Sequence, residues 1–86
     1  MEPKDISGSL LALLTAIAPD IDPAAVDPAI DFSDQFDFDS MDRLHFAIAI
    51  SENFKIDIPE ADYARLAGLR KACEYVANKL GPRQPS

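Results

Sequence analysis

Residues 36–54 read FDFDSMDRLHFAIAISENF, and this stretch predicts the central helix of the molecule together with its candidate site. Asp39 precedes an apolar helical pattern, so its carboxylate is placed to cap a helix that Ser40 opens. Asp42 follows three residues later and is placed to return a hydrogen bond to the cap, as in a capping box. We therefore expect the Ser40 hydroxyl at the N-terminal end of a helix over about 40–54, where a phosphate ester is electrostatically favoured.

The predicted helix over 40–54 has a wider apolar arc than a surface helix of a globular protein. The arc consists of Met41, Leu44, Ala47, Ile48, Ile50 and Phe54, with Phe46 and Ala49 beyond it. We expect this helix both to pack at the centre of a bundle and to present apolar side chains to a partner.

Three further helices are predicted around it. Apolar residues with helical spacing predict a first helix over about 5–18, which Pro19 ends. Pro59 favours the first turn of a short third helix over about 60–66. The most regular apolar stripe in the chain predicts a fourth helix over about 69–80. The sequence therefore predicts an all-α fold, a small four-helix bundle with three longer helices, one short helix and a long first loop.

Length and composition restrict the class of protein. The chain has 86 residues, enough for one domain, which we expect over 1–81, with a disordered tail over 82–86. A single cysteine excludes a disulfide framework. Neither an apolar run of about 18 residues nor a signal-peptide pattern is found, which predicts no membrane partner and a cytoplasmic location.

The net charge of −7 is concentrated in one part of the chain. Residues 19–42 hold eight aspartates and neither lysine nor arginine. Such an acidic field argues against nucleic acid as a partner, and it would steer basic protein surfaces toward Ser40. The alternative interpretation is a solvated acidic loop that serves solubility.

The other chemically versatile side chains predict no catalytic site. Cys73 lies on the apolar stripe of the fourth helix, where a cysteine is ordinarily a small core residue. His45 has no cysteine or second histidine at ligand spacing, which indicates a surface position. The segment that begins at Asp37 lacks the ligands of an EF-hand calcium loop, so no metal site is predicted.

The order of short motifs along the chain resembles the acyl carrier protein family. The motifs are Phe36-x-x-Asp39-Ser40-Met41-Asp42, an apolar helix closing on Glu52-Asn53-Phe54, then Ile58-Pro59 and Glu74-Tyr75-Val76. The resemblance needs no gap from residue 36 to residue 80, and the first helix with its long loop extends it over nearly the whole chain. It implies a four-helix bundle of the acyl-carrier type.

The resemblance implies a carrier and not an enzyme. Ser40 would be esterified with 4′-phosphopantetheine, taken from coenzyme A by a separate magnesium-dependent phosphopantetheinyl transferase, with Asp39 beside the metal and the phosphate during that transfer. The carrier would hold acyl groups as thioesters on the arm. It would deliver them to ligases, synthases or transferases with basic surfaces, in fatty-acid, lipid or polyketide-type synthesis. Because no strong apolar face is left over once four helices pack, we expect a monomer.

Two surfaces follow from the resemblance. Partner enzymes would recognise the helix over 40–54, with contacts at Phe38, Met41, Asp42, Arg43, His45, Ile48 and Glu52. An acyl chain is expected between this helix and the short third helix, in a pocket lined by Ala47, Ile50, Phe54, Ile58, Tyr63 and Leu66.

The sequence also departs from the family pattern. Asp37 replaces a usual glycine, so a positive φ there would leave a strained residue. Arg43 and His45 make the central helix less acidic than in housekeeping fatty-acid carriers, which predicts a specialised carrier. Two alternatives stay open: an acidic helical adaptor in which Ser40 is unmodified, and a D-alanyl or aminoacyl carrier, because Asp-Ser-Met also resembles D-alanyl carriers.

Overall fold

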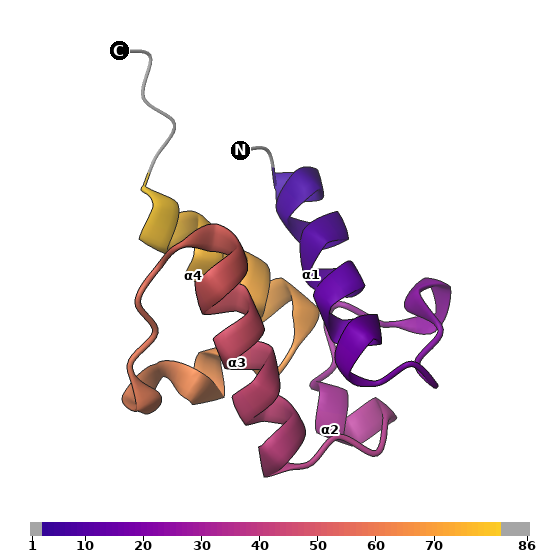
Figure 1. Ribbon diagram of the computed structural model, residues 1–86. Coiled ribbons are helices and arrows are strands. Elements are labelled where there is room, and N and C mark those ends of the chain that lie inside the picture. Colours follow the sequence, from indigo (N-terminus) through magenta and orange to yellow (C-terminus); the bar gives the residue numbers. More distant parts are fainter. Residues whose placement is uncertain (1–2, 82–86) are drawn as a thin grey trace.

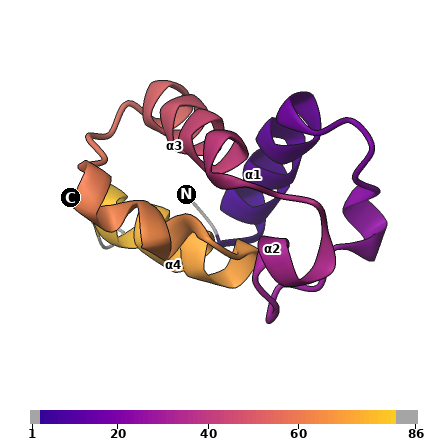
Figure 2. The ribbon, with the colours of Figure 1, turned by 90° about the horizontal axis from the view of Figure 1, so that it is seen from below.

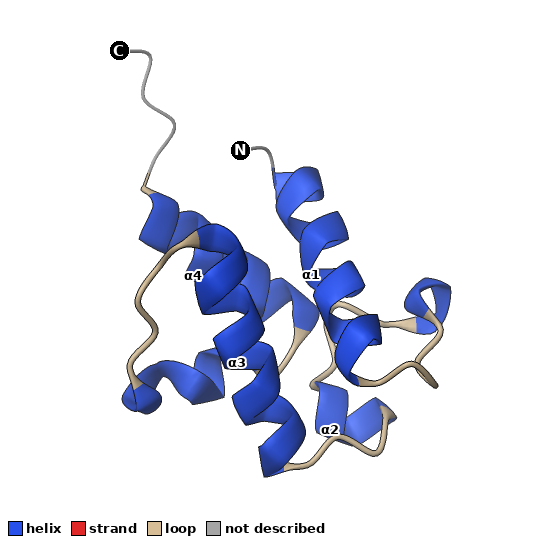
Figure 3. Cartoon of the chain, viewed as in Figure 1, coloured by secondary structure: helices blue, strands red, loops and turns tan. Residues whose placement is uncertain are grey.

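The computed structural model describes residues 3–81, and every element within them is helical (Figures 1 and 3). The elements are α1 (Pro3–Ile17), η1 (Pro23–Ala25), α2 (Phe32–Gln35), α3 (Ser40–Phe54), η2 (Glu60–Leu66) and α4 (Leu69–Leu80), where η denotes a 3₁₀ helix. This confirms the predicted all-α class, with three long helices and a short one between the last two. The predicted tail over 82–86 lies outside the described residues. No helix within residues 3–81 has the length and apolar character needed to cross a membrane.

The long helices pack around one core, with α3 between α1 and η2 (Figures 1 and 2). Both α1 and η2 contact α3 and α4, so α1 and η2 each link α3 to α4. The buried core consists of Ile6, Leu10, Leu14, Ile21, Phe32, Phe38, Phe46, Ala47, Ile50, Phe54, Ile58, Leu66, Leu69, Ala72, Tyr75 and Val76. Because these residues come from all three long helices, η2 and the connections, the core is continuous through the domain.

The core-facing side of α3 differs from the predicted arc. Phe46, which the sequence placed beyond the arc, is completely buried, whereas Met41 and Ile48 are 57% and 45% exposed. Burial follows positions 46, 47, 50 and 54, which share one side of a helix. Two large aromatic rings therefore decide which side of α3 faces inward, and the exposed Met41 and Ile48 lie on another side.

The long connection between α1 and α3 is more ordered than the sequence predicts. Two of its apolar residues, Phe32 and Phe38, are buried in the core, whereas Ile30 is 41% exposed. The short helix α2 was not predicted. It depends on contacts with a distant part of the chain, since the Phe32 N–H donates to the carbonyl of Ala67 over 2.7 Å.

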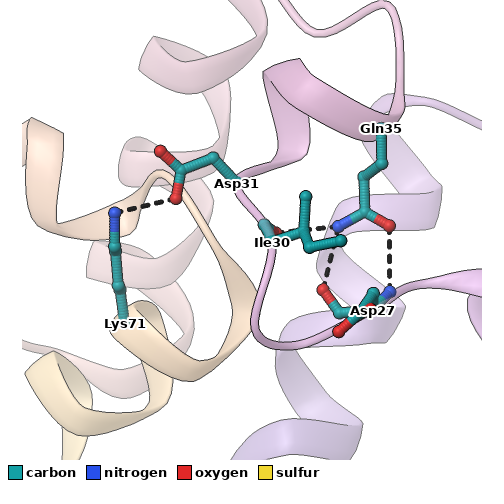
Figure 4. A network of polar contacts seen from close by, with 5 residues as sticks. All are labelled: Asp27, Ile30, Asp31, Gln35 and Lys71. Carbon is teal, nitrogen blue, oxygen red and sulfur yellow. Dashed lines mark hydrogen bonds and ion pairs between the residues drawn. The ribbon is translucent and has the colours of Figure 1, made fainter.

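Side chains fix this connection in place, as Figure 4 shows. The Gln35 amide binds the backbone N–H and the C=O of Asp27, each over 2.9 Å, and the C=O of Ile30 over 2.8 Å. Asp31 pairs with Lys71 of α4 over 2.7 Å. The residues that lead to α3 are therefore held both within their own loop and against α4.

The short helix η2 is held by α4. The Tyr75 hydroxyl donates to the Asp62 carboxylate over 2.7 Å, and the Arg65 guanidinium lies 5.0 Å from the centre of the Tyr75 ring. Burial of the phenol, followed by this hydrogen bond, raises the pKa of Tyr75 to about 12. The phenol therefore stays protonated and keeps donating to Asp62 at every physiological pH, which fixes η2 relative to α4.

Candidate functional site

The first turn of α3 has the predicted capping box. Asp39, with φ −97° and ψ −173°, is extended, and its Oδ1 accepts the N–H of Asp42 over 3.0 Å. The Asp42 Oδ2 accepts the N–H of Asp39 over 3.3 Å. These reciprocal bonds satisfy two N–H groups that the helix itself leaves free. Ser40 is the first residue of the helix that this cap begins.

An aromatic cluster fixes the chain just before the cap. The ring centres of Phe32 and Phe38 are 5.2 Å apart, those of Phe32 and Phe46 are 5.6 Å apart, and those of Phe38 and Phe46 are 6.3 Å apart. These tilted and edge-to-face contacts are geometries that aromatic pairs prefer. Phe38 is only 8% exposed, so its ring packs in the core and does not offer the partner contact that the sequence predicts.

Ser40 is exposed and lies at the edge of a groove between α3 and η2. The groove has a volume of about 470 Å³ and is lined by Ser40, Met41, Arg43, Leu44, Glu60, Ala61, Tyr63 and Ala64. Most of these side chains are apolar, with one cation and one carboxylate among them. A group attached to the Ser40 oxygen therefore has a surface to lie on that begins at the point of attachment.

The predicted partner contacts occupy different environments. Four of them, Met41, His45, Ile48 and Glu52, are exposed and recur at helical spacing, so they share one side of α3, which we call the outer face. Asp42 and Arg43 are half-buried, and Arg43 lies in the groove. The outer face combines apolar, imidazole and acidic groups and is open to contact by another protein.

The predicted acyl pocket lies deeper than the groove. Ala47, Ile50, Phe54, Ile58 and Leu66 are all buried in the core. Only Tyr63 among the six lines the groove, and it is half-buried. The structure thus brings α3 and η2 together as expected, but with core side chains filling the interval where the pocket was predicted.

Sequence reasoning missed half of the residues that line the groove. Leu44 lies on α3, and Glu60, Ala61 and Ala64 lie on η2. Their spacing carries a usable signal, because positions i and i+4 share one side of an α-helix, and positions i and i+3 share one side of a 3₁₀ helix. Residue 44 is four after Ser40 in the α-helix α3, and residue 64 is three after Ala61 in the 3₁₀ helix η2. That these sides of α3 and η2 face each other across the groove, however, depends on tertiary packing.

The remaining sequence candidates are placed as follows. Lys55 is the only non-glycine residue with a positive φ within residues 3–81, so Asp37 has an ordinary backbone conformation. Burial raises the pKa of the Cys73 thiol, which disfavours the thiolate, the reactive form of a cysteine. His45 is exposed, as expected. In the described part of the chain, no three His, Cys, Asp or Glu side chains gather as a metal site.

Comparison with known proteins places this site in context. A family model described as "Phosphopantetheine attachment site" matches residues 9–76. An acyl carrier protein of Picosynechococcus sp. is 32% identical over 62 residues, which cover 72% of this chain and 76% of that protein. An acyl carrier protein of Thermosynechococcus vestitus is 27% identical over 60 residues, covering 70% and 74%. A mitochondrial acyl carrier protein of Neurospora crassa is 31% identical over 58 residues, covering 67% of this chain and 43% of that protein.

Proposed function

Because this chain belongs to the phosphopantetheine-attachment family, we propose that it carries acyl groups on a 4′-phosphopantetheine arm esterified to Ser40. Members of this family are carriers and not catalysts, and their arm is covalently bound. When bound, the arm supplies a terminal thiol that holds an acyl group as a thioester. The observation that carries the proposal is the exposed Ser40, the first residue of α3, at the edge of the groove.

The residues around Ser40 fit such a group. The hydroxyl is open to a transferase, and the groove beside it offers apolar side chains to an extended chain. Asp39 is exposed, and one of its carboxylate oxygens is engaged by the Asp42 N–H. Within residues 3–81 its other oxygen accepts no hydrogen bond, so it remains available to the metal ion during transfer.

Intact mass measures the attachment directly. Incubation of the wild type with coenzyme A, magnesium and a broad-specificity phosphopantetheinyl transferase should add the mass of one phosphopantetheine group. Ser40→Ala should add none, because the attacking oxygen is gone. Ser33→Ala removes an exposed hydroxyl from α2 and should be modified like the wild type. An unchanged wild-type mass would leave the unmodified acidic adaptor as the function, and a mass gain on Ser40→Ala would move the attachment to another residue.

We further propose a specialised carrier, a cytoplasmic monomer whose partners present basic surfaces. Most aspartates of residues 19–42 are exposed, and Asp39 and Asp42 lie in the first turn of α3 beside Ser40, so the site has a negative field that favours basic partners. The outer face of α3, however, combines His45 with Glu52 and two apolar side chains. It offers less negative charge to a basic partner than a uniformly acidic helix does. The dedicated partner would be an acyl ligase, synthase or transferase, or an aminoacyl-loading ligase if the cargo is D-alanine.

The specialised role predicts poor loading by a general enzyme. A fatty-acid malonyltransferase should acylate the modified protein with a kcat/KM at least about tenfold below that for a housekeeping carrier, a difference of about 1.4 kcal/mol. His45→Glu should recover part of the loss, because it adds negative charge to the outer face. Equal efficiency for the two carriers would contradict the specialised role without affecting the attachment at Ser40.

A further inference from the structure

Arg43 is a cation beside the proposed attachment point. It lies three residues after Ser40, so the two residues are neighbours on the same side of α3, with Cβ atoms about 5–6 Å apart. Both line the groove. Arg43 is half-buried, and within the described part of the chain it forms no ion pair with a carboxylate. A partly desolvated guanidinium without an anion is therefore positioned next to Ser40.

The nearby carboxylates are engaged elsewhere or lie across the groove. Asp39 and Asp42 bind each other's backbone N–H groups in the capping box. Glu60 lines the groove from η2, but among residues 3–81 it forms no ion pair with Arg43. Leu44 and Tyr63 line the same groove and add no charge to it. An anion on the Ser40 oxygen would therefore meet Arg43 as the cation within the groove.

We propose that Arg43 binds the phosphodiester that joins the arm to Ser40, which rests on the attachment proposed above. A phosphodiester carries one negative charge and presents two free oxygens. The planar guanidinium matches such a pair of oxygens with two parallel N–H donors, which a lysine ammonium does not. An arginine side chain is long enough to span the separation between neighbouring positions on one side of a helix. Arg43 thereby holds the base of the arm at the groove, in place of the partner contact that the sequence predicts for it.

The contact has a physical consequence for the carrier. With its base held at the groove, the arm leaves Ser40 along the surface between α3 and η2 and not straight into solvent. Because the pair lies at the surface, salt should weaken it, and a partner that competes for Arg43 or for the phosphodiester should release the arm.

Phosphorus NMR on the modified protein without any partner tests the proposal. The wild type, Arg43→Gln and Arg43→Lys are converted with the transferase, and intact mass establishes that each carries one arm. Arg70→Gln is the matched control, because Arg70 is an exposed arginine of α4 outside the groove. Circular dichroism checks that all variants keep the helical fold. The readouts are the ³¹P chemical shift and relaxation of the single phosphodiester at low salt and at about 1 M salt, where the screening length is about 3 Å.

We expect the wild-type resonance to be displaced from that of Arg43→Gln and to relax as a less mobile group. Salt should move the wild-type resonance toward that of Arg43→Gln, which should itself respond little, whereas Arg43→Lys should lie between the two. Arg70→Gln should match the wild type. Identical shifts and salt responses in wild type and Arg43→Gln, or an equal change in Arg70→Gln, would overturn the contact while the attachment stands. A wild type that accepts no arm would overturn both proposals together.

Discussion

Replacing Phe46 with alanine should lower the free energy of unfolding by about 3–5 kcal/mol, as for other buried phenylalanines. The ring is completely buried and contacts both Phe32 and Phe38. Removing it leaves a cavity at the junction of α2, α3 and the chain before the cap. Because a small domain is stable by only about 5–15 kcal/mol, this single change should remove a large share of the total. Urea unfolding followed by circular dichroism measures the loss.

An exposed residue of the same helix provides the comparison. Ile48 lies on the outer face of α3 and is 45% exposed. Ile48→Ala should therefore change the free energy of unfolding by no more than about 0.5 kcal/mol. Phe46→Leu should retain part of the lost stability, because it refills some of the cavity. Equal effects of Phe46→Ala and Ile48→Ala would mean that the orientation of α3 described above is wrong.

The helix bounds could be predicted because local chemistry sets them. Asp39 and Asp42 form the capping box that begins α3, and both partners lie within one turn. The apolar residues of α4 likewise recur with helical spacing within the helix itself. The orientation of α3 was harder, because its apolar residues nearly encircle the helix. Periodicity then favours no single side, and contact with Phe32 and Phe38 decides which side is buried.

Other features depend on residues far apart in the sequence. The short helix α2 is held by the bond from Phe32 to Ala67 and by the ion pair between Asp31 and Lys71. Neither contact is visible in the local pattern of residues 31–35. The candidate site likewise has one part set by local sequence and another set by tertiary packing. Ser40 and its cap are local and were predicted, whereas the wall that η2 contributes to the groove depends on packing.

Replacing Asp39 with asparagine should separate the two roles that we assign to this carboxylate. Asparagine caps a helix about as well as aspartate, because its side-chain oxygen accepts the same N–H of Asp42. Asp39→Asn should therefore keep the thermal stability of the wild type. Asp39→Ala loses the cap and should be destabilised by about 1 kcal/mol. Thermal unfolding of the two variants measures this difference.

The rate of arm attachment should not follow the thermal stability of these two variants. If the negative charge of Asp39 helps to hold the metal ion during transfer, both variants should be modified more slowly by roughly 10- to 100-fold, the range for loss of a group that orients a metal. Asp57→Asn removes an equal charge from an exposed position in the connection between α3 and η2 and should be modified at the wild-type rate. Time-resolved intact mass gives these rates. If Asp39→Asn is modified at the wild-type rate, the charge of Asp39 has no role in the transfer. Asp39 would then act only as the helix cap, through the oxygen that accepts the N–H of Asp42.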